Sequence, residues 1–194
     1  IIKLFVIVFT IAAIGHAVND LVDQEVDNIE KKHRPLPSKL VTPNAIRYFI
    51  ALAITLSLIV SLATPTLLFW VSSFCLMLSI SYSLWIKSTV LLGNITVGLL
   101  SAMTIIYGGI KTGVIESIIM IAGLMIFFYV LSREILKTIE DKVGDKMFGI
   151  NTLATKFGVK TSLMFFLGTM FIFIFCALLP WFLNFATQLY LYLI

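Results

Sequence analysis

Acidic side chains gather in one short stretch of the chain, at the end of a long apolar segment. The stretch reads "NDLVDQEVDNIE" over 19–30 and holds five of the ten acidic residues in the sequence. Asn19, Asp23 and Asp27 are spaced four apart, and Asp20 comes three before Asp23. In a helix, side chains at this spacing lie along one face. A helix through this stretch would therefore carry a stripe of oxygen ligands.

A second acidic cluster, "EDKVGD" over 140–145, repeats part of this pattern. Asp141 and Asp145 are again four apart, and Glu140 stands beside them. The basic residues interleaved with these acids are Arg133, Lys137, Lys142 and Lys146. Such an alternation is suited to a phosphate bridged by metal ions, because the basic side chains hold the outer phosphate oxygens.

Carboxylates at this spacing repel one another, and a counter-cation removes the conflict. Hard carboxylate and amide oxygens suit Mg²⁺, which proteins hold through one or two carboxylates together with phosphate oxygens and water. Acids at a membrane edge are candidates for function, and here the D-x-x-x-D pair occurs twice. Four of the nearby charged residues are interpreted instead as solvated helix ends, namely Glu25, Glu30, Glu134 and Lys146.

The elements that position these acids are predicted to be membrane helices. The chain is 60% hydrophobic and 12% charged, with a mean hydropathy of +1.06, far more apolar than a soluble domain. Continuous apolar runs of nearly bilayer length favour an all-α, multi-pass transmembrane helical bundle over a barrel. We expect about seven spans in a single domain over 1–194. Their approximate bounds are 1–18, 45–63, 66–84, 90–109, 114–132, 160–178 and 181–194.

Charge predicts the orientation of these spans. The connections 19–44 and 133–159, and the one around Lys87, are separated by even numbers of crossings, so they fall on one side. That side holds every basic residue except Lys3 and Lys111. The positive-inside rule therefore places both acid motifs on the cytoplasmic side of the cell membrane. The basic residues form no compact basic domain, which argues against nucleic-acid binding.

The two acidic stretches belong to an internal sequence repeat. Each opens D-x-x-x-D and is followed by a related hexamer, "RPLPSK" at 34–39 and "NTLATK" at 151–156. Both stretches follow an apolar helix and precede another one. This arrangement is expected of a duplicated two-helix unit, or of two halves built to the same end.

Taken together, these motifs resemble those of the UbiA superfamily of membrane prenyltransferases. The segment "NDLVDQEVD" (19–27) fits its N-D-x-x-D-x-x-x-D motif, and "DKVGD" (141–145) fits its second D-x-x-x-D. "RPLPSK" (34–39) is similar to the R-P-[LI]-P-S-G that follows the first motif, with Lys39 in place of the usual Gly. "GINTLATKFG" (149–158) is similar to the segment after the second motif. The resemblance covers essentially the whole chain.

The resemblance implies a bundle of nine helices, so we expect one further helix before Ile1 and one after Ile194. It also implies that Mg²⁺ bridges the aspartates to a prenyl diphosphate and draws charge onto the leaving group. An allylic cation then reacts with an acceptor inside a bundle that excludes water. The implied partners are a prenyl diphosphate, a lipid or aromatic acceptor and membrane lipids, and the oligomeric state stays open.

The resemblance also assigns candidate roles to individual residues. The expected metal ligands are Asn19, Asp20, Asp23, Asp27, Asp141 and Asp145, and the acids expected to be central to catalysis are Asp23, Asp27, Asp141 and Asp145. The candidates for substrate binding are Asn19, Lys32, Arg34, Lys87, Asn94, Arg133, Lys137 and Lys142. Lys87 ranks high because it is the only charged residue between 48 and 110, although a lysine that merely reaches the membrane interface explains it equally well.

Four functions are compared with this pattern. The chain looks most like the archaeal branch of the family, which transfers a geranylgeranyl group to the glycerol hydroxyl of geranylgeranylglyceryl phosphate. The alternative is an aromatic prenyltransferase of quinone biosynthesis, such as one that acts on 4-hydroxybenzoate. A cation transporter would carry its acids at mid-depth in broken helices rather than at one membrane face. A CDP-alcohol phosphotransferase would open its motif D-G-x-x-A-R, whereas Asp20 is followed by Leu21.

Overall fold

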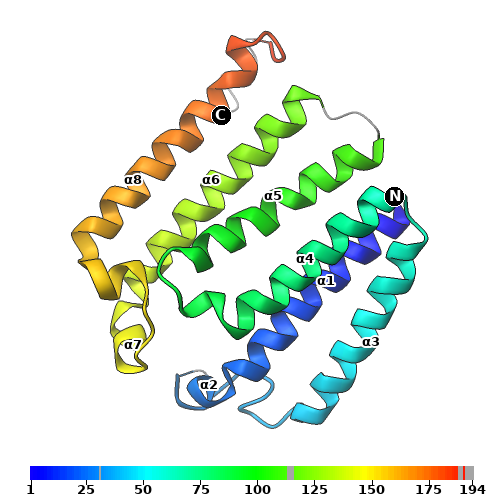
Figure 1. Cartoon of the computed structure of the whole chain (residues 1–194). Coiled ribbons are helices and arrows are strands. Elements are labelled where there is room, and N and C mark those ends of the chain that lie inside the picture. Colours follow the sequence, from blue (N-terminus) through cyan, green and yellow to red (C-terminus); the bar gives the residue numbers. More distant parts are fainter. Residues whose placement is uncertain (31, 113–115, 188–189, 191–194) are drawn as a thin grey trace. The chain divides into compact units, whose positions relative to one another are not determined.

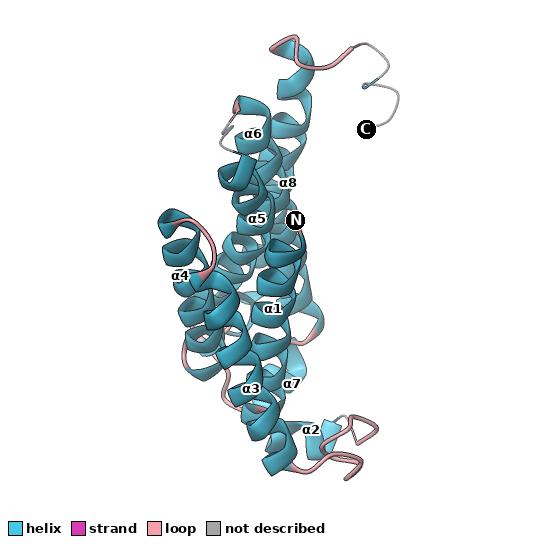
Figure 2. Ribbon diagram, turned by 90° about the vertical axis from the view of Figure 1, so that its right-hand side faces the viewer, coloured by secondary structure: helices cyan, strands magenta, loops and turns pink. Residues whose placement is uncertain are grey.

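The computed structural model describes residues 1–30, 32–112, 116–187 and 190, and within these ranges the regular structure is entirely helical (Figures 1 and 2). Six of the helices are long and apolar enough to cross a membrane. By its internal contacts the chain divides into two compact units, Ile1–Lys87 and Ser88–Ile194. The all-α, multi-pass prediction is confirmed, whereas the single domain over 1–194 stays a prediction.

The first unit is built around α1 (Ile2–Val22), which packs against both α3 (Pro43–Leu62) and α4 (Thr66–Leu84). The short α2 (Gln24–Glu30) follows α1 directly, and the 3₁₀ turn η1 (Ile86–Ser88) follows α4. The core of the unit joins Ile14, Ala53 and Leu76, one from each long helix. At the far end of α1, Lys3 Nζ donates to the carbonyl oxygen of Ala63 at 3.0 Å. The start of α1 therefore lies beside the end of α3, as in an antiparallel hairpin.

Close approach of α1 and α4 depends on a glycine near the acid motif. A Cβ atom at Gly15 would lie 2.3 Å from Ser79 Oγ, so a larger residue would require the serine to move. On the same face, Ser83 Oγ donates to the carbonyl oxygen of Gly15 at 3.3 Å. Small residues and hydroxyl bonds of this kind are how membrane helices pack without a hydrophobic driving force between them. They hold the end of α1, where the first acids lie, against the end of α4.

The second unit is built around α6 (Ser117–Glu140), which packs against both α5 (Leu92–Thr112) and α8 (Leu153–Phe182). The short α7 (Lys142–Met147) lies between α6 and α8 in the chain (Figure 1). Leu131, Ile135 and Leu153 form the core near the second acid motif. On α5, a Cβ atom at Gly98 would lie 3.1 Å from the carbonyl oxygen of Phe127 on α6, so this glycine sets the helix separation.

The predicted count of about seven spans is too high for the described residues, which contain six. Pro180 was expected to separate two spans, but it is buried inside α8, which ends at Phe182. Residues 183–187 are not helical, and 188–189 and 191–194 lie outside the described residues, so the predicted span over 181–194 is not found in the described part. The predicted edges also differ, because α1 and α6 continue past their apolar runs to Val22 and Glu140.

Candidate functional site

Both acid motifs open where a membrane helix ends. Asp23 terminates α1 with φ −86° and ψ 4°, and its N–H donates to the carbonyl oxygen of Asn19 at 2.9 Å. Asp141 terminates α6 with φ −82° and ψ 0°, and its N–H donates to the carbonyl oxygen of Lys137 at 2.9 Å. A short helix begins at the next residue in each case, at Gln24 and at Lys142. Asp23 and Asp141 therefore have nearly the same backbone conformation, each at the end of a long helix in its own unit.

The four-residue spacing continues across each break. The N–H of Asp27 donates to the carbonyl oxygen of Asp23 at 2.8 Å, and that of Asp145 donates to the carbonyl oxygen of Asp141 at 2.9 Å. These are bonds of α-helical type, so each pair of aspartates still follows the helical spacing. The repeat seen in the sequence is therefore matched by the same backbone hydrogen bond in both motifs.

The related hexamers, in contrast, fold differently. "RPLPSK" lies in turns, where the N–H of Ser38 donates to the carbonyl oxygen of Arg34 at 2.9 Å. "NTLATK" instead opens α8, with Thr152 and Thr155 forming a reciprocal cap. Lys39 has φ 61°, a left-handed conformation that favours glycine. This conformation explains why the family resemblance expects Gly at the position that Lys39 occupies here.

The first motif is held by an arginine from the following loop. Arg34 Nη1 lies 2.6 Å from Asp27 Oδ2 and 3.4 Å from Asp20 Oδ1. Asp20 belongs to α1 and Asp27 to α2, so one guanidinium nitrogen contacts carboxylates on both sides of the break at Asp23. Arg34 was predicted to bind substrate, and in this structure it binds two of the predicted metal ligands.

The Asp23 carboxylate is paired with a lysine from the end of α4. Lys87 Nζ forms an ion pair with Asp23 Oδ1 and also lies 3.4 Å from Asn19 Oδ1. Asn19 in turn donates from Nδ2 to Asp23 Oδ2 at 2.8 Å. Lys87 therefore does more than reach the membrane interface: with Arg34, it supplies positive charge to the first motif.

The Asn19 and Asp23 side chains fit a divalent cation. Both direct an oxygen at the Lys87 ammonium, which stands in for a positive ion beside two hard ligands. Mg²⁺ usually takes one or two such protein oxygens and completes its shell with water and phosphate. Over the ranges that the structure describes, no group of three or more acidic, histidine or cysteine side chains is arranged to hold a metal. The larger ligand set therefore stays a prediction.

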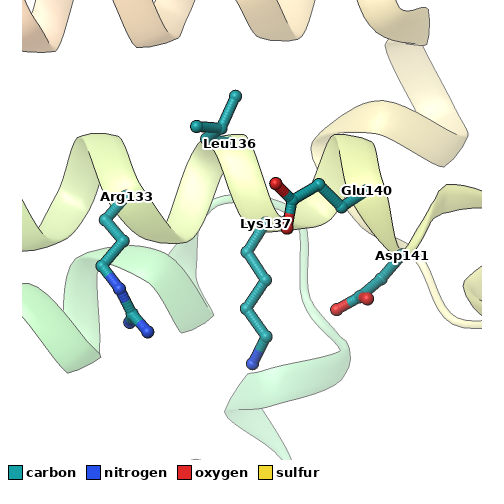
Figure 3. Close-up of a pocket in the computed structure, with 5 residues that line it drawn as sticks. All are labelled: Arg133, Leu136, Lys137, Glu140 and Asp141. Carbon is teal, nitrogen blue, oxygen red and sulfur yellow. The ribbon is translucent and has the colours of Figure 1, made fainter.

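The second motif borders a pocket of about 290 Å³ on α6. Its lining residues are Arg133, Leu136, Lys137, Glu140 and Asp141. Figure 3 shows the charged ends of Arg133, Lys137 and Asp141 on one side of the helix, as their spacing of four requires. Arg133 also pairs with its neighbour Glu134 at 2.8 Å. Two cations beside a terminal carboxylate can hold an anion whose charge is shared with a metal.

Glu140 belongs to the second acidic cluster of the sequence but was given no role among the predicted site residues. Glu140 lines the pocket with the predicted residues because it lies seven positions after Arg133, two turns along the same face. That spacing was the available signal. Of the other predicted residues, Lys32 is exposed in the loop after α2, and Lys142 and Asp145 are half-buried in α7. Asn94 is half-buried in the first turn of α5.

Known sequences similar to this chain share one family. The profile of the UbiA prenyltransferase family matches residues 1–194. Digeranylgeranylglyceryl phosphate synthase of Sulfolobus acidocaldarius is 39% identical over 179 residues, which cover 92% of this chain and 65% of that protein. The protein of the same name from Hyperthermus butylicus is 36% identical over 81% of this chain and 55% of itself. The chain thus spans less than two thirds of the length of these two relatives.

Solved structures give the same answer for the fold. A structure from work on digeranylgeranylglyceryl phosphate synthase in membranes has a TM-score of 0.81 and 30% identity, covering 99% of this chain and 68% of that one. The apo structure of a UbiA homolog from Aeropyrum pernix has a TM-score of 0.82 at 14% identity, covering 97% of this chain and 72% of that one. The arrangement of helices is therefore retained where little sequence identity remains.

Proposed function

Because this chain belongs to the UbiA prenyltransferase family, we propose that it acts as a Mg²⁺-dependent membrane prenyltransferase on a prenyl diphosphate. The observation that carries the proposal is the second acid motif, where Arg133 and Lys137 share one face of α6 with the terminal carboxylate of Asp141. This set can bind an anion and a metal ion at the same helix end. The matching backbone at Asp23 supports a role for both motifs in one reaction.

The finer proposal concerns the two substrates. The donor is geranylgeranyl diphosphate, and the acceptor is the glycerol hydroxyl of geranylgeranylglyceryl phosphate. Two relatives that are 39% and 36% identical are named digeranylgeranylglyceryl phosphate synthase, which supports this choice. The acceptor is itself an anionic lipid, and the surplus of basic residues, with a formal net charge of +4, suits such a substrate.

The reaction breaks the allylic C–O bond of the donor and forms a C–O bond to the acceptor. Diphosphate leaves with the electron pair of the broken bond, and the acceptor hydroxyl loses its proton. Bound Mg²⁺ supplies electrostatic stabilisation of the departing diphosphate. The residues that would hold it are Asn19 and Asp23 in the first unit, and Asp141 and Asp145 in the second.

The chain's own side chains do the remaining work. Arg133 and Lys137 bind and orient anionic oxygens through charge-assisted hydrogen bonds. The apolar helices house the isoprenoid tail and exclude water, which would otherwise quench the allylic cation. Both motifs act at the cytoplasmic face of the cell membrane, because the basic residues gather in the connections of that side.

One experiment tests activity and acceptor together. The purified full-length protein is given geranylgeranyl diphosphate and Mg²⁺ with either geranylgeranylglyceryl phosphate or 4-hydroxybenzoate, and the products are identified by mass spectrometry. We expect a product that carries one more geranylgeranyl group only with the glycerophosphate lipid. A prenylated benzoate would overturn the acceptor, and no product with any acceptor together with no diphosphate release would overturn the prenyltransferase.

A further inference from the structure

We propose that Arg34 is a positioning residue and that Asp27 is its structural counter-ion rather than a ligand of Mg²⁺. The inference rests on the proposed function, because it concerns which oxygens of the first motif are left for the metal. The oxygens assigned to Mg²⁺ in this unit are those of Asn19 and Asp23. Arg34 fixes the helix break that presents them.

The Arg34 guanidinium spans the break between α1 and α2. Asp20 is on the last turn of α1, and Asp27 is on α2. Arg34 Nη1 contacts both, at 3.4 Å and 2.6 Å. Between them lies Asp23, whose backbone ends α1. A single guanidinium group therefore ties the two helices together across the residue that faces the Lys87 ammonium.

Asp23 and Asp27 differ in how deeply their side chains are buried. The Asp27 side chain is only 4% exposed, whereas that of Asp23 is 29% exposed. Mg²⁺ gives up water reluctantly and keeps several water ligands when it binds protein carboxylates. Asp23 can meet such a hydrated ion, but Asp27 is enclosed against Arg34. A buried carboxylate needs a paired cation, and the arginine provides it.

The loop after α2 holds Arg34 through its own backbone hydrogen bonds. The carbonyl oxygen of Arg34 accepts from the N–H of Ser38 at 2.9 Å, and that of Pro35 accepts from the N–H of Val41 at 3.2 Å. Leu36, two residues beyond the arginine, is buried. The equivalent position after the second motif is Asn151, which lies just before the capped start of α8. The arginine tie is therefore a feature of the first motif.

Binding of Mn²⁺, followed by electron paramagnetic resonance of the free ion, tests the assignment without any need for turnover. The full-length protein is titrated in its wild-type form and as D23N and D27N. The two variants are a matched pair, because each removes one negative charge from the same motif. We expect D23N to weaken Mn²⁺ binding by about tenfold or more, and D27N to weaken it by less than about threefold, the effect of charge alone. Equal losses in both variants would overturn the proposal.

The charge-neutral double variant R34Q/D27N tests positioning by Arg34. It removes the tie without changing the net charge of the motif, so a change in Mn²⁺ affinity reports the geometry of Asp23. We expect affinity to fall below that of D27N alone, with an altered line shape for the bound ion, while R34K/D27N retains the affinity of D27N. Wild-type affinity in R34Q/D27N would overturn the positioning role.

Two further outcomes keep this test separate from the proposed function. If the wild-type protein binds no Mn²⁺ that D23N can remove, the metal site of the proposed function fails and this inference fails with it. If the wild-type protein binds Mn²⁺ and transfers prenyl groups, but D27N abolishes binding, only this inference fails. Thermal melting of every variant shows whether it is folded, and R34K/D27N, which is expected to keep the affinity of D27N, replaces D27N should the single variant unfold.

Discussion

Lys87 gives the first motif a positive charge of its own. Its ammonium contacts the Asn19 and Asp23 oxygens that we assign to Mg²⁺, so lysine and metal compete for the same carboxylate. Replacement by an uncharged side chain of similar length should remove this competition. Two unit charges about 4 Å apart interact by about 1 kcal/mol in water and by more in a less polar site.

We therefore expect K87M to bind Mn²⁺ more tightly than the wild-type protein, by about fivefold or more, in the absence of diphosphate. The measurement is a Mn²⁺ titration of the full-length protein. R47Q serves as the control, because Arg47 is a cation on the first turn of α3 that pairs with Asn44 at 2.7 Å. Unchanged or weaker binding by K87M would show that the ammonium does not compete with the metal.

Asp23 and Asp141, which open the two D-x-x-x-D pairs, are expected to be indispensable for turnover. D23A and D141A should each lower the rate of diphosphate release by at least about a hundredfold, because each removes an oxygen that holds the leaving group's metal. Neither side chain belongs to the buried core, so both variants should fold. Phosphate-coupled detection of released diphosphate gives the rate. The control is E116A, which removes an acid from the other end of α6. Full activity in D23A or D141A would show that these carboxylates do not hold a metal ion that the reaction needs.

Much of the site's composition could be predicted from residue types and spacing, but the ion pairs within it could not. Arg133, Lys137 and Asp141 could each be named from the sequence, and their spacing of four accounts for the side of α6 that they share in Figure 3. The same reasoning treated Asp23 and Asp27 as equivalent ligands. They differ because the chain after α2 folds back and brings Arg34 against Asp27. Helical periodicity cannot predict this contact, because Arg34 lies in a loop and not on the same helix.

At the scale of the elements, small residues set how closely the helices approach. Gly98 and Gly108 lie on the same helix, α5, in different surroundings. A Cβ atom at Gly98 would meet the carbonyl oxygen of Phe127 at 3.1 Å and its ring at 3.2 Å. A Cβ atom at Gly108 would meet nothing within 4 Å among the residues that the structure describes. The pair allows packing to be separated from helix propensity, since both changes to alanine favour the helix equally.

We expect G98A to lower the melting temperature of the detergent-solubilised protein and G108A to leave it unchanged or raise it. The cost at Gly98 comes from moving the Phe127 backbone and ring away, which opens the contact between α5 and α6, and overpacking of this kind costs about 1–3 kcal/mol. The measurement is thermal melting of both variants beside the wild-type protein. Equal melting temperatures for the two variants would show that the glycine does not set the separation.

Element boundaries were the least predictable part of the fold, for a physical reason. Apolar runs report where lipid or neighbouring helices contact the chain, but backbone hydrogen bonding continues beyond them. Helices α1 and α6 therefore extend to Val22 and Glu140 and bring charged residues into regular helix. Conversely, Pro180 was expected to end a helix, yet it lies in α8 two residues before the helix stops. A proline inside a helix removes the hydrogen bond from its own position to the carbonyl four residues earlier, and α8 continues for only two more residues after this loss.

At the scale of the whole molecule, the order of the six spans constrains which connections share a side of the membrane. If each of the six candidate helices crosses once, the residues 23–42 and 141–152 emerge on the same side, because an even number of crossings separates them. Lys111, near the end of α5, emerges on the other side. The positive-inside rule then predicts that the side with both acid motifs is the cytoplasmic one.

Labelling of single cysteines tests this topology in vesicles of known orientation. We expect H33C and K146C to react with a membrane-impermeant maleimide only in inside-out vesicles, and K111C only in right-side-out ones. The native Cys75 and Cys176 are buried, so the unsubstituted protein gives the background. All three positions are exposed, which makes reactivity depend on the side of the membrane rather than on burial. Labelling of H33C and K146C from opposite sides would be incompatible with two motifs that serve one reaction, because a diphosphate at one membrane face could not meet both.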